Sequence, residues 1–115
     1  MSLSNFAVSI DGVLTDFVIG DYSDNLFIAI TQFQKLGCIV SVRKDVMNDY
    51  SSAQEEVYDV CTLLGSSDES TELAARYLAE QLNIPKSVIF SINLKDKSLR
   101  TLKAIRKVLL PRKSW

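Results

Sequence analysis

The sequence predicts an α+β fold: a single domain over residues 1–115, mainly an antiparallel six-stranded sheet with two helices in the C-terminal half packed against it. Three observations lead to this expectation. Apolar and polar residues alternate through much of the first two-thirds of the chain, as in half-buried strands. Short turn-forming stretches join most of these segments, as in hairpins. The later apolar pattern has the period of amphipathic helices, and the length suits one domain.

The first three strands are expected to form a meander. Segment 6–10 alternates apolar and small or polar residues, which indicates the first strand. Asp11–Gly12 predicts a tight turn into a second strand over about 14–20. Leu26–Ile30 is apolar on both faces. We therefore expect this third strand to lie centrally in the sheet.

The middle of the chain predicts another hairpin and one long loop. Segment 32–37 has the composition of a short hairpin connection, with Gly37 expected at positive φ, and 38–42 is expected as the returning strand. Residues 44–56 follow neither the strand nor the helix period, so we expect a long loop, which in a small domain is often functional. A fifth strand is expected over about 57–63.

The last third predicts a helix, a strand and a second helix. Ser66 and Glu69 have the spacing of a capping box at the first helix, which Pro85 ends near Asn83. Its expected buried stripe consists of Leu73, Ala74, Tyr77, Leu78 and Leu82. A sixth strand alternates over 88–94. Asp96 or Ser98 is expected to cap a second helix over about 97–110, with an apolar arc formed by Leu99, Leu102, Ile105 and Leu109.

Composition argues against most enzyme classes. The chain has no histidine, which excludes Ser-His-Asp and Cys-His catalytic arrangements and any metal site that needs imidazole. Two cysteines cannot form a four-thiolate zinc site, and four scattered glycines do not form a phosphate-binding loop. We therefore expect no enzyme, no cofactor, and no catalytic or metal-binding residue.

One motif resembles an enzyme signature. Residues 9–16 are similar to the D-x-D-G-x-L-x-D loop of haloacid-dehalogenase phosphatases, in which the first aspartate is the nucleophile. Ser9 occupies that position here, a strand pattern follows where the family has a helix, and the chain is too short for that family's core. We interpret the motif as a strand, a turn and a strand.

Charge is divided sharply along the chain. Residues 1–94 contain five lysines and arginines against 13 acidic residues, whereas 95–115 contain eight against one. On the second helix, Arg100, Lys103 and Lys107 lie beside the apolar arc, and Arg106 falls within it. A solvated face, an acidic protein partner and a nucleic acid are all open interpretations, although the acidic remainder of the chain would repel nucleic acid. A buried Arg106 must either extend to solvent or meet a carboxylate, which a partner chain could supply.

Four stretches, taken in order, resemble the proteasome assembly chaperone 3 family. They are Thr31–Gly37, Val40–Ser41, Leu63–Gly65 and Lys95–Val108, and Trp115 also fits. The resemblance implies a non-enzymatic factor with a six-stranded sheet and helices packed against it. Members pair with proteasome assembly chaperone 4-like proteins and can form a homodimer in isolation. The heterodimer holds alpha-type subunits of the 20S proteasome while the alpha ring forms, and leaves as beta subunits arrive.

Two groups of residues are candidates for partner binding. The resemblance implies that the loop between the fourth and fifth strands, here 44–56, is mobile and contacts alpha-type subunits. Its candidate residues are Lys44, Asp45, Asn48, Asp49 and Tyr50. The charge pattern of the second helix supplies the other candidates, Arg100, Lys103, Arg106 and Lys107. The alternative function is a small nucleic-acid-binding module that uses this basic helix.

The expected location is the cytoplasm, with the nucleus as a second location. The N-terminal sequence MSLSNF has no basic region before an apolar stretch, so we expect no signal peptide. The longest apolar run, Leu26–Ile30, is far shorter than the ~20 residues that a membrane-spanning helix requires. We therefore expect no membrane partner.

Overall fold

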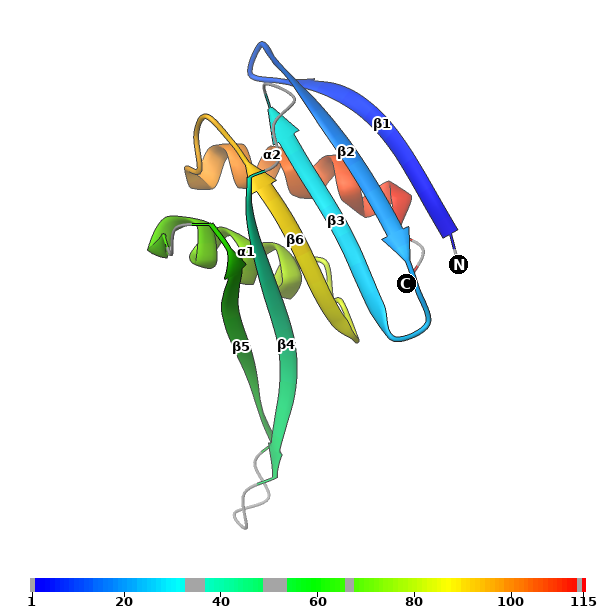
Figure 1. The fold of residues 1–115 in the computed structure, drawn as a ribbon, viewed down its shortest axis with the longest axis vertical. Coiled ribbons are helices and arrows are strands. Elements are labelled where there is room, and N and C mark those ends of the chain that lie inside the picture. The colour runs from blue at the N-terminus through cyan, green and yellow to red at the C-terminus, as the bar shows by residue number, and fades with distance from the viewer. Residues whose placement is uncertain (1, 33–36, 49–53, 66–67, 114) are drawn as a thin grey trace.

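The computed structural model describes residues 2–32, 37–48, 54–65, 68–113 and 115, and it confirms the predicted fold class. A six-stranded sheet, ordered β1-β2-β3-β6-β4-β5, carries both helices on one of its faces (Figure 1). The elements are β1 (Ser2–Ile10), β2 (Val13–Asp21), β3 (Asn25–Gln32), β4 (Cys38–Asn48), β5 (Gln54–Leu64), α1 (Glu69–Gln81), β6 (Ser87–Asn93), α2 (Leu99–Leu109) and a 3-10 turn, Leu110–Arg112.

The meander of the first three strands forms as predicted. Asp11 and Gly12 have φ angles of 49° and 80° and join β1 to β2, with Ile10 paired to Val13. Two successive positive φ values are typical of the tight hairpin turn that matches strand twist, and glycine adopts them at little cost. β3 lies between β2 and β6, which confirms the central place predicted from its apolar residues on both faces.

The predicted hairpin between the third and fourth strands is wrong. β6 lies between β3 and β4, parallel to β3 and antiparallel to β4. β6 supplies Val88, Phe90 and Ile92 to the core, so a central position buries more apolar surface than an edge would. Gly37 is also not at positive φ. Glycine is required there for a different reason, because a Cβ atom would overlap the backbone carbonyl of Ile92.

The predicted long loop over 44–56 is mostly strand. β4 continues to Asn48 and β5 begins at Gln54, and these two residues pair. β6 pairs with β4 only as far as Val42, so the hairpin beyond that residue pairs with nothing else in the described chain and projects past the rest of the sheet (Figure 1). An alternating pattern is imposed where a strand has one face against a core, and a two-stranded ribbon that extends beyond the sheet is under less such constraint, so its sequence can resemble a loop.

The first helix begins at a different cap from the one predicted. Asp68, rather than Ser66, is the N-cap, and its carboxylate accepts a hydrogen bond from the backbone N–H of Ser70. The helix ends near Asn83 as predicted, with φ of 50° at that residue. Its buried face combines small residues, Thr71, Ala74, Ala75 and Ala79, with the large side chain of Leu78. The predicted core residue Leu73 is instead 55% exposed.

The single core lies between the sheet and the two helices. The largest fully buried side chains from the sheet include Phe17, Ile28 and Phe90, and the helices add Leu78 and Ile105. Each such burial contributes roughly 1.5–3 kcal/mol. The C-terminus is held against this core, because the indole N–H of Trp115 donates to the carbonyl of Leu82 at 3.1 Å. Within the described chain, neither helix has the length and hydrophobicity that crossing a bilayer requires.

Candidate functional site

The start of α2 is fixed by Asp96, three residues before the helix. Its carboxylate accepts hydrogen bonds from the backbone N–H of Ser98 at 3.0 Å, from the Ser98 hydroxyl at 2.7 Å and from the Thr101 hydroxyl at 2.9 Å. The Ser98 and Thr101 hydrogen bonds hold the pKa of Asp96 below its ordinary value. Ser98 is the N-cap, but its own side chain does not cap the helix. The sequence prediction of Asp96 or Ser98 therefore holds with the two residues acting together.

An ion pair links the starts of the two helices. Lys97 Nζ lies 3.1 Å from Asp68 Oδ2, and it also donates to the Thr71 hydroxyl at 3.2 Å. The Lys97 contact, followed by the hydrogen bonds from Ser70, lowers the pKa of Asp68 from 3.8 to about 2. Asp68 thus caps α1 and also forms an ion pair with Lys97, which precedes α2. This contact sets the relative position of the two helix starts.

We expect Asp68→Asn to weaken folding above about pH 4 and to change the acid limb of the stability curve. Because the folded-state pKa lies below the ordinary value of 3.8, the ionised carboxylate stabilises the fold above that pH, and this contribution disappears as the pH falls toward about 2. Urea unfolding between about pH 2 and pH 6 measures the effect. The variant and the parent should converge near pH 2. Asp24→Asn, at an exposed carboxylate, is the control, and an equal change there would contradict the assignment.

The buried side of α2 agrees with the predicted arc except at its start. Leu102, Ile105 and Leu109 are buried, but Leu99 is 54% exposed. Arg106 is half-buried, and its Nε atom is enclosed without a hydrogen-bond partner. No carboxylate within the described chain pairs with this arginine. Of the two predicted outcomes, the described residues therefore supply no carboxylate, and the partial exposure of Arg106 allows its side chain to extend to solvent.

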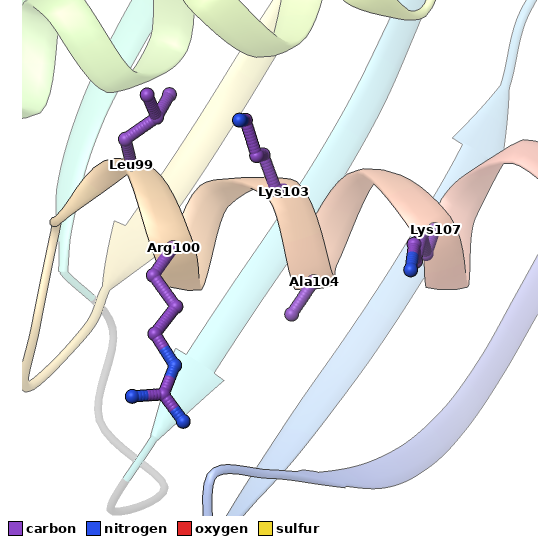
Figure 2. Close-up of a pocket in the computed structure, with 5 residues that line it drawn as sticks. All are labelled: Leu99, Arg100, Lys103, Ala104 and Lys107. Atoms are coloured by element: carbon purple, nitrogen blue, oxygen red, sulfur yellow. The ribbon is translucent and has the colours of Figure 1, made fainter.

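The outward side of α2 forms a shallow basic hollow, which we call the α2 hollow. It is lined by Leu99, Arg100, Lys103, Ala104 and Lys107. Figure 2 shows Leu99 and Lys103 extending toward α1, with Arg100 and Ala104 on the other side of the helix. The structure thus brings three of the four predicted helix residues together. Arg106 does not line the hollow.

The positive charges of the α2 hollow are barely neutralised by carboxylates of the described residues. Arg100 Nη2 lies 3.4 Å from Asp11 Oδ1, and both side chains are well exposed, so this pair contributes little. Lys103 and Lys107 form no ion pair with any described residue. The hollow is therefore a positively charged surface with an exposed leucine beside it.

The other predicted group does not join this site. Lys44, Asp45 and Asn48 lie on β4, paired with Tyr58, Val57 and Gln54 of β5. Asp49 and Tyr50 lie outside the described residues. The hairpin that carries the three placed residues projects away from α2 (Figure 1). Loop and helix candidates are therefore two separate regions, and the first is largely a β-ribbon.

A second surface, which sequence reasoning missed, is the sheet face that carries no helix. We call it the open sheet face. Strand pairing aligns two rows of side chains across all six strands on this face. In strand order, the rows are Asn5–Val18–Ala29–Ser91–Ile39–Leu64 and Leu3–Gly20–Phe27–Ile89–Ser41–Cys61. Their chain neighbours, including Phe17, Ile28 and Phe90, point into the core, so alternation places the rows outward.

Neither row of the open sheet face contains a charged residue. Charged residues flank the two rows on the same face, with Asp16 on one side and the Arg43–Asp59 pair on the other. The rows therefore form an uncharged central band, and such a band on a face without helices indicates a surface that a partner covers. Tyr22, Phe27 and Ile89 also line a hollow at one end of this face. The signal was available in the sequence: Leu26–Ile30 is apolar on both sides although only one side faces helices.

Comparison with known proteins gives the family. A family model described as Proteasome assembly chaperone 3 matches residues 28–110. The chain belongs to the proteasome assembly chaperone 3 family. Proteasome assembly chaperone 3 of Mus musculus is 30% identical over 108 residues, covering 90% of this chain and 86% of the mouse protein. The Homo sapiens protein gives the same identity and coverage. The Nematostella vectensis protein is 54% identical over 39 residues, 34% of this chain and 29% of that protein.

A solved structure supports the fold of this family member. A chain of the crystal structure titled as a novel chaperone complex for yeast 20S proteasome assembly superposes with a TM-score of 0.72 at 16% identity, covering 93% of this chain and 95% of that chain. At this identity the likeness concerns the fold alone. The family resemblance inferred from the sequence is confirmed, and proteasome assembly chaperones are not a class of enzymes.

Proposed function

We propose that this protein is a non-enzymatic chaperone that promotes assembly of the alpha ring of the 20S proteasome. It binds alpha-type subunits as a heterodimer with a proteasome assembly chaperone 4-like protein, in the cytoplasm and also in the nucleus. Family membership supports the assembly role. The observation that carries the pairing is the open sheet face, whose two rows hold no charged side chain.

The open sheet face suits a partner with the same kind of surface. Six strands about 4.8 Å apart give a face roughly 25–30 Å wide, and two to three rows of side chains give it a depth of roughly 20 Å. That area is roughly 500–600 Å² in projection, somewhat smaller than the roughly 800 Å² per partner of a standard interface. Serine and asparagine within the rows keep the surface partly polar, as expected for a complex that must later dissociate. A second copy of this chain could occupy the same face when the partner is absent.

The chaperone acts by mass action. It stabilises alpha-type subunits before the ring is complete and loses affinity when the next assembly state changes or covers the bound surface. No bond is made or broken in this mechanism, so the chain needs no catalytic group or cofactor. The acidic body and basic α2 orient the encounter with partners and affect the association rate more than the affinity.

Reconstitution tests the proposal. The chain is co-expressed with a chaperone 4-like protein, its mass is measured by light scattering, and purified alpha-type subunits are added. We expect a one-to-one heterodimer that binds free alpha-type subunits and accelerates alpha-ring formation on native gels. Absence of pairing in light scattering would contradict the heterodimer. An unchanged rate of ring formation despite pairing would contradict the assembly role.

A further inference from the structure

The α2 hollow and the open sheet face lie on opposite sides of the molecule. α2 packs on the helix-bearing side of the sheet (Figure 1), and Figure 2 shows Lys103 extending from it toward α1 and Arg100 extending to the other side of the helix. A partner stacked on the open sheet face would leave the hollow accessible. The molecule therefore has room for two partners at once.

The chemistry of the hollow differs from that of the open sheet face. Three cations, Arg100, Lys103 and Lys107, line the hollow together with the exposed side chain of Leu99, and no carboxylate lines it. Elsewhere on the chain, Lys86 pairs with Asp21, and Lys97 pairs with Asp68. Arg100 has Asp11 within 3.4 Å, but Lys103 and Lys107 form no ion pair with any described residue, and an incoming group of negative charge relieves the repulsion between them.

The apolar side chains in the hollow favour a protein over a nucleic acid. Leu99 and Ala104 offer a contact for an aliphatic side chain, and no aromatic residue lines the hollow to stack on a base. Trp115, the aromatic residue at the end of the basic segment, is engaged by the carbonyl of Leu82. The remainder of the chain, residues 1–94, carries a net charge of −8, which would repel an extended polyanion.

We propose that the α2 hollow is the docking site for an acidic amphipathic segment of the client protein. This assignment rests on the proposed function, in which the client is an alpha-type subunit and the other chaperone occupies the open sheet face. Lys103 and Lys107 are one helical turn apart, about 6 Å along the axis. Two carboxylates one turn apart on a client helix match this spacing, and an apolar side chain beside them meets Leu99, which extends on the same side of α2 as Lys103 (Figure 2).

A defined peptide tests the chemistry without any proteasome component. The probe is a fluorescein-labelled helical peptide with glutamates one turn apart flanking a leucine, and its twin carries glutamines instead. Fluorescence anisotropy with the full chain should show binding of the glutamate peptide, about tenfold weaker for the glutamine twin. Amide NMR shifts should concentrate at residues 99–107. Equal binding of the two peptides, or shifts confined to other elements, would overturn the assignment.

Matched variants separate local from net charge. Lys103→Glu with Lys107→Glu changes the hollow, and Lys95→Glu with Lys113→Glu makes the same change of net charge at exposed lysines outside it. We expect about a tenfold or greater loss of peptide binding for the first pair and less than about threefold for the second, both shrinking as salt rises. Similar losses for the two pairs would overturn a defined docking site.

The reconstituted heterodimer separates failure of this inference from failure of the proposed function. The Lys103→Glu and Lys107→Glu variant should still pair with the chaperone 4-like protein but should capture alpha-type subunits about tenfold more weakly. If the parent heterodimer captures subunits and the variant captures them equally well, the docking assignment fails while the function stands. If the parent captures no subunit, the proposed function fails.

Tight binding of labelled RNA or duplex DNA, lost in the same variant, would replace the protein client with a nucleic acid.

Discussion

Replacing Gly37 with alanine is expected to destabilise the fold by about 3 kcal/mol or more, the largest effect expected at any of the four glycines. The new Cβ would overlap the carbonyl carbon and oxygen of Ile92 and would lie 2.7 Å from the backbone nitrogen of Asn93. These are backbone atoms of a central strand and cannot rotate away as a side chain could. The first residues of β4 would have to separate from β6, breaking the ladder that joins the two halves of the sheet.

Urea unfolding followed by circular dichroism measures this change against Gly12→Ala. Gly12 has φ of 80° with no atom within 4 Å of the added Cβ, so alanine there meets only backbone strain of about 1–2 kcal/mol. If Gly37→Ala were no more destabilising than Gly12→Ala, β4 would not approach β6 as described. If Gly37→Ala does not fold, co-expression with the chaperone 4-like protein should recover less soluble protein than it does for Gly12→Ala.

The contrast between these two glycines shows what the sequence could predict. At Gly12, the requirement is local: Asp11–Gly12 joins two adjacent strands, and residue type alone indicates the turn. At Gly37, the requirement comes from β6, whose residue Ile92 is distant in sequence. A local pattern could identify the glycine as special but suggested the wrong reason, because the insertion of β6 between β3 and β4 cannot be inferred from the intervening residues.

The same distinction explains the other differences. The core-facing residues of β6 and most of those of α2 were predictable because alternation and helical period directly reflect burial. The ribbon after Val42 was interpreted as a loop because its sequence lacks the strand period, and β6 does not pair with it there. Leu73 and Leu99 begin apolar stripes yet remain exposed, since each lies toward the outer side of its helix, beyond the reach of the sheet. Periodicity identifies a stripe but does not say how much of its width another element will cover.

Of the candidate site, charge was predictable and geometry was not. The basic segment is visible in the sequence, and the structure assembles Arg100, Lys103 and Lys107 in one hollow. Arg106 follows the same charge pattern but is half-buried and outside that hollow. The open sheet face depends on strand order, because only the pairing of all six strands aligns its uncharged rows. Its apolar residues would otherwise be taken as part of the core.

Introducing a charge at the centre of the open sheet face is expected to abolish pairing while leaving the monomer folded. Ile89 is half-buried and lies between Phe27 and Ser41 in the second row. In Ile89→Asp the carboxylate stays hydrated in the monomer but loses water without gaining a partner when another sheet covers it. An unpaired buried charge costs about 3 kcal/mol or more, so the dissociation constant should rise about 100-fold or more.

Leu73→Asp is the matched control. It also replaces an aliphatic side chain with a carboxylate, but at an exposed leucine on the helix-bearing side of the molecule. Light scattering and sedimentation of each variant with the chaperone 4-like protein measure pairing, and thermal melting of each variant alone measures folding. Only Ile89→Asp should lose the heterodimer, and the homodimer of the isolated chain should disappear with it if both use the same face. A heterodimer that survives Ile89→Asp would place the partner elsewhere. The uncharged rows would then have no explanation, since both helices of the described residues lie on the other face of the sheet. If Ile89→Asp loses pairing but melts at the same temperature as the parent, the open sheet face is the interface. In that case strand order forms a partner surface from residues that the periodicity of the sequence alone would assign to the core.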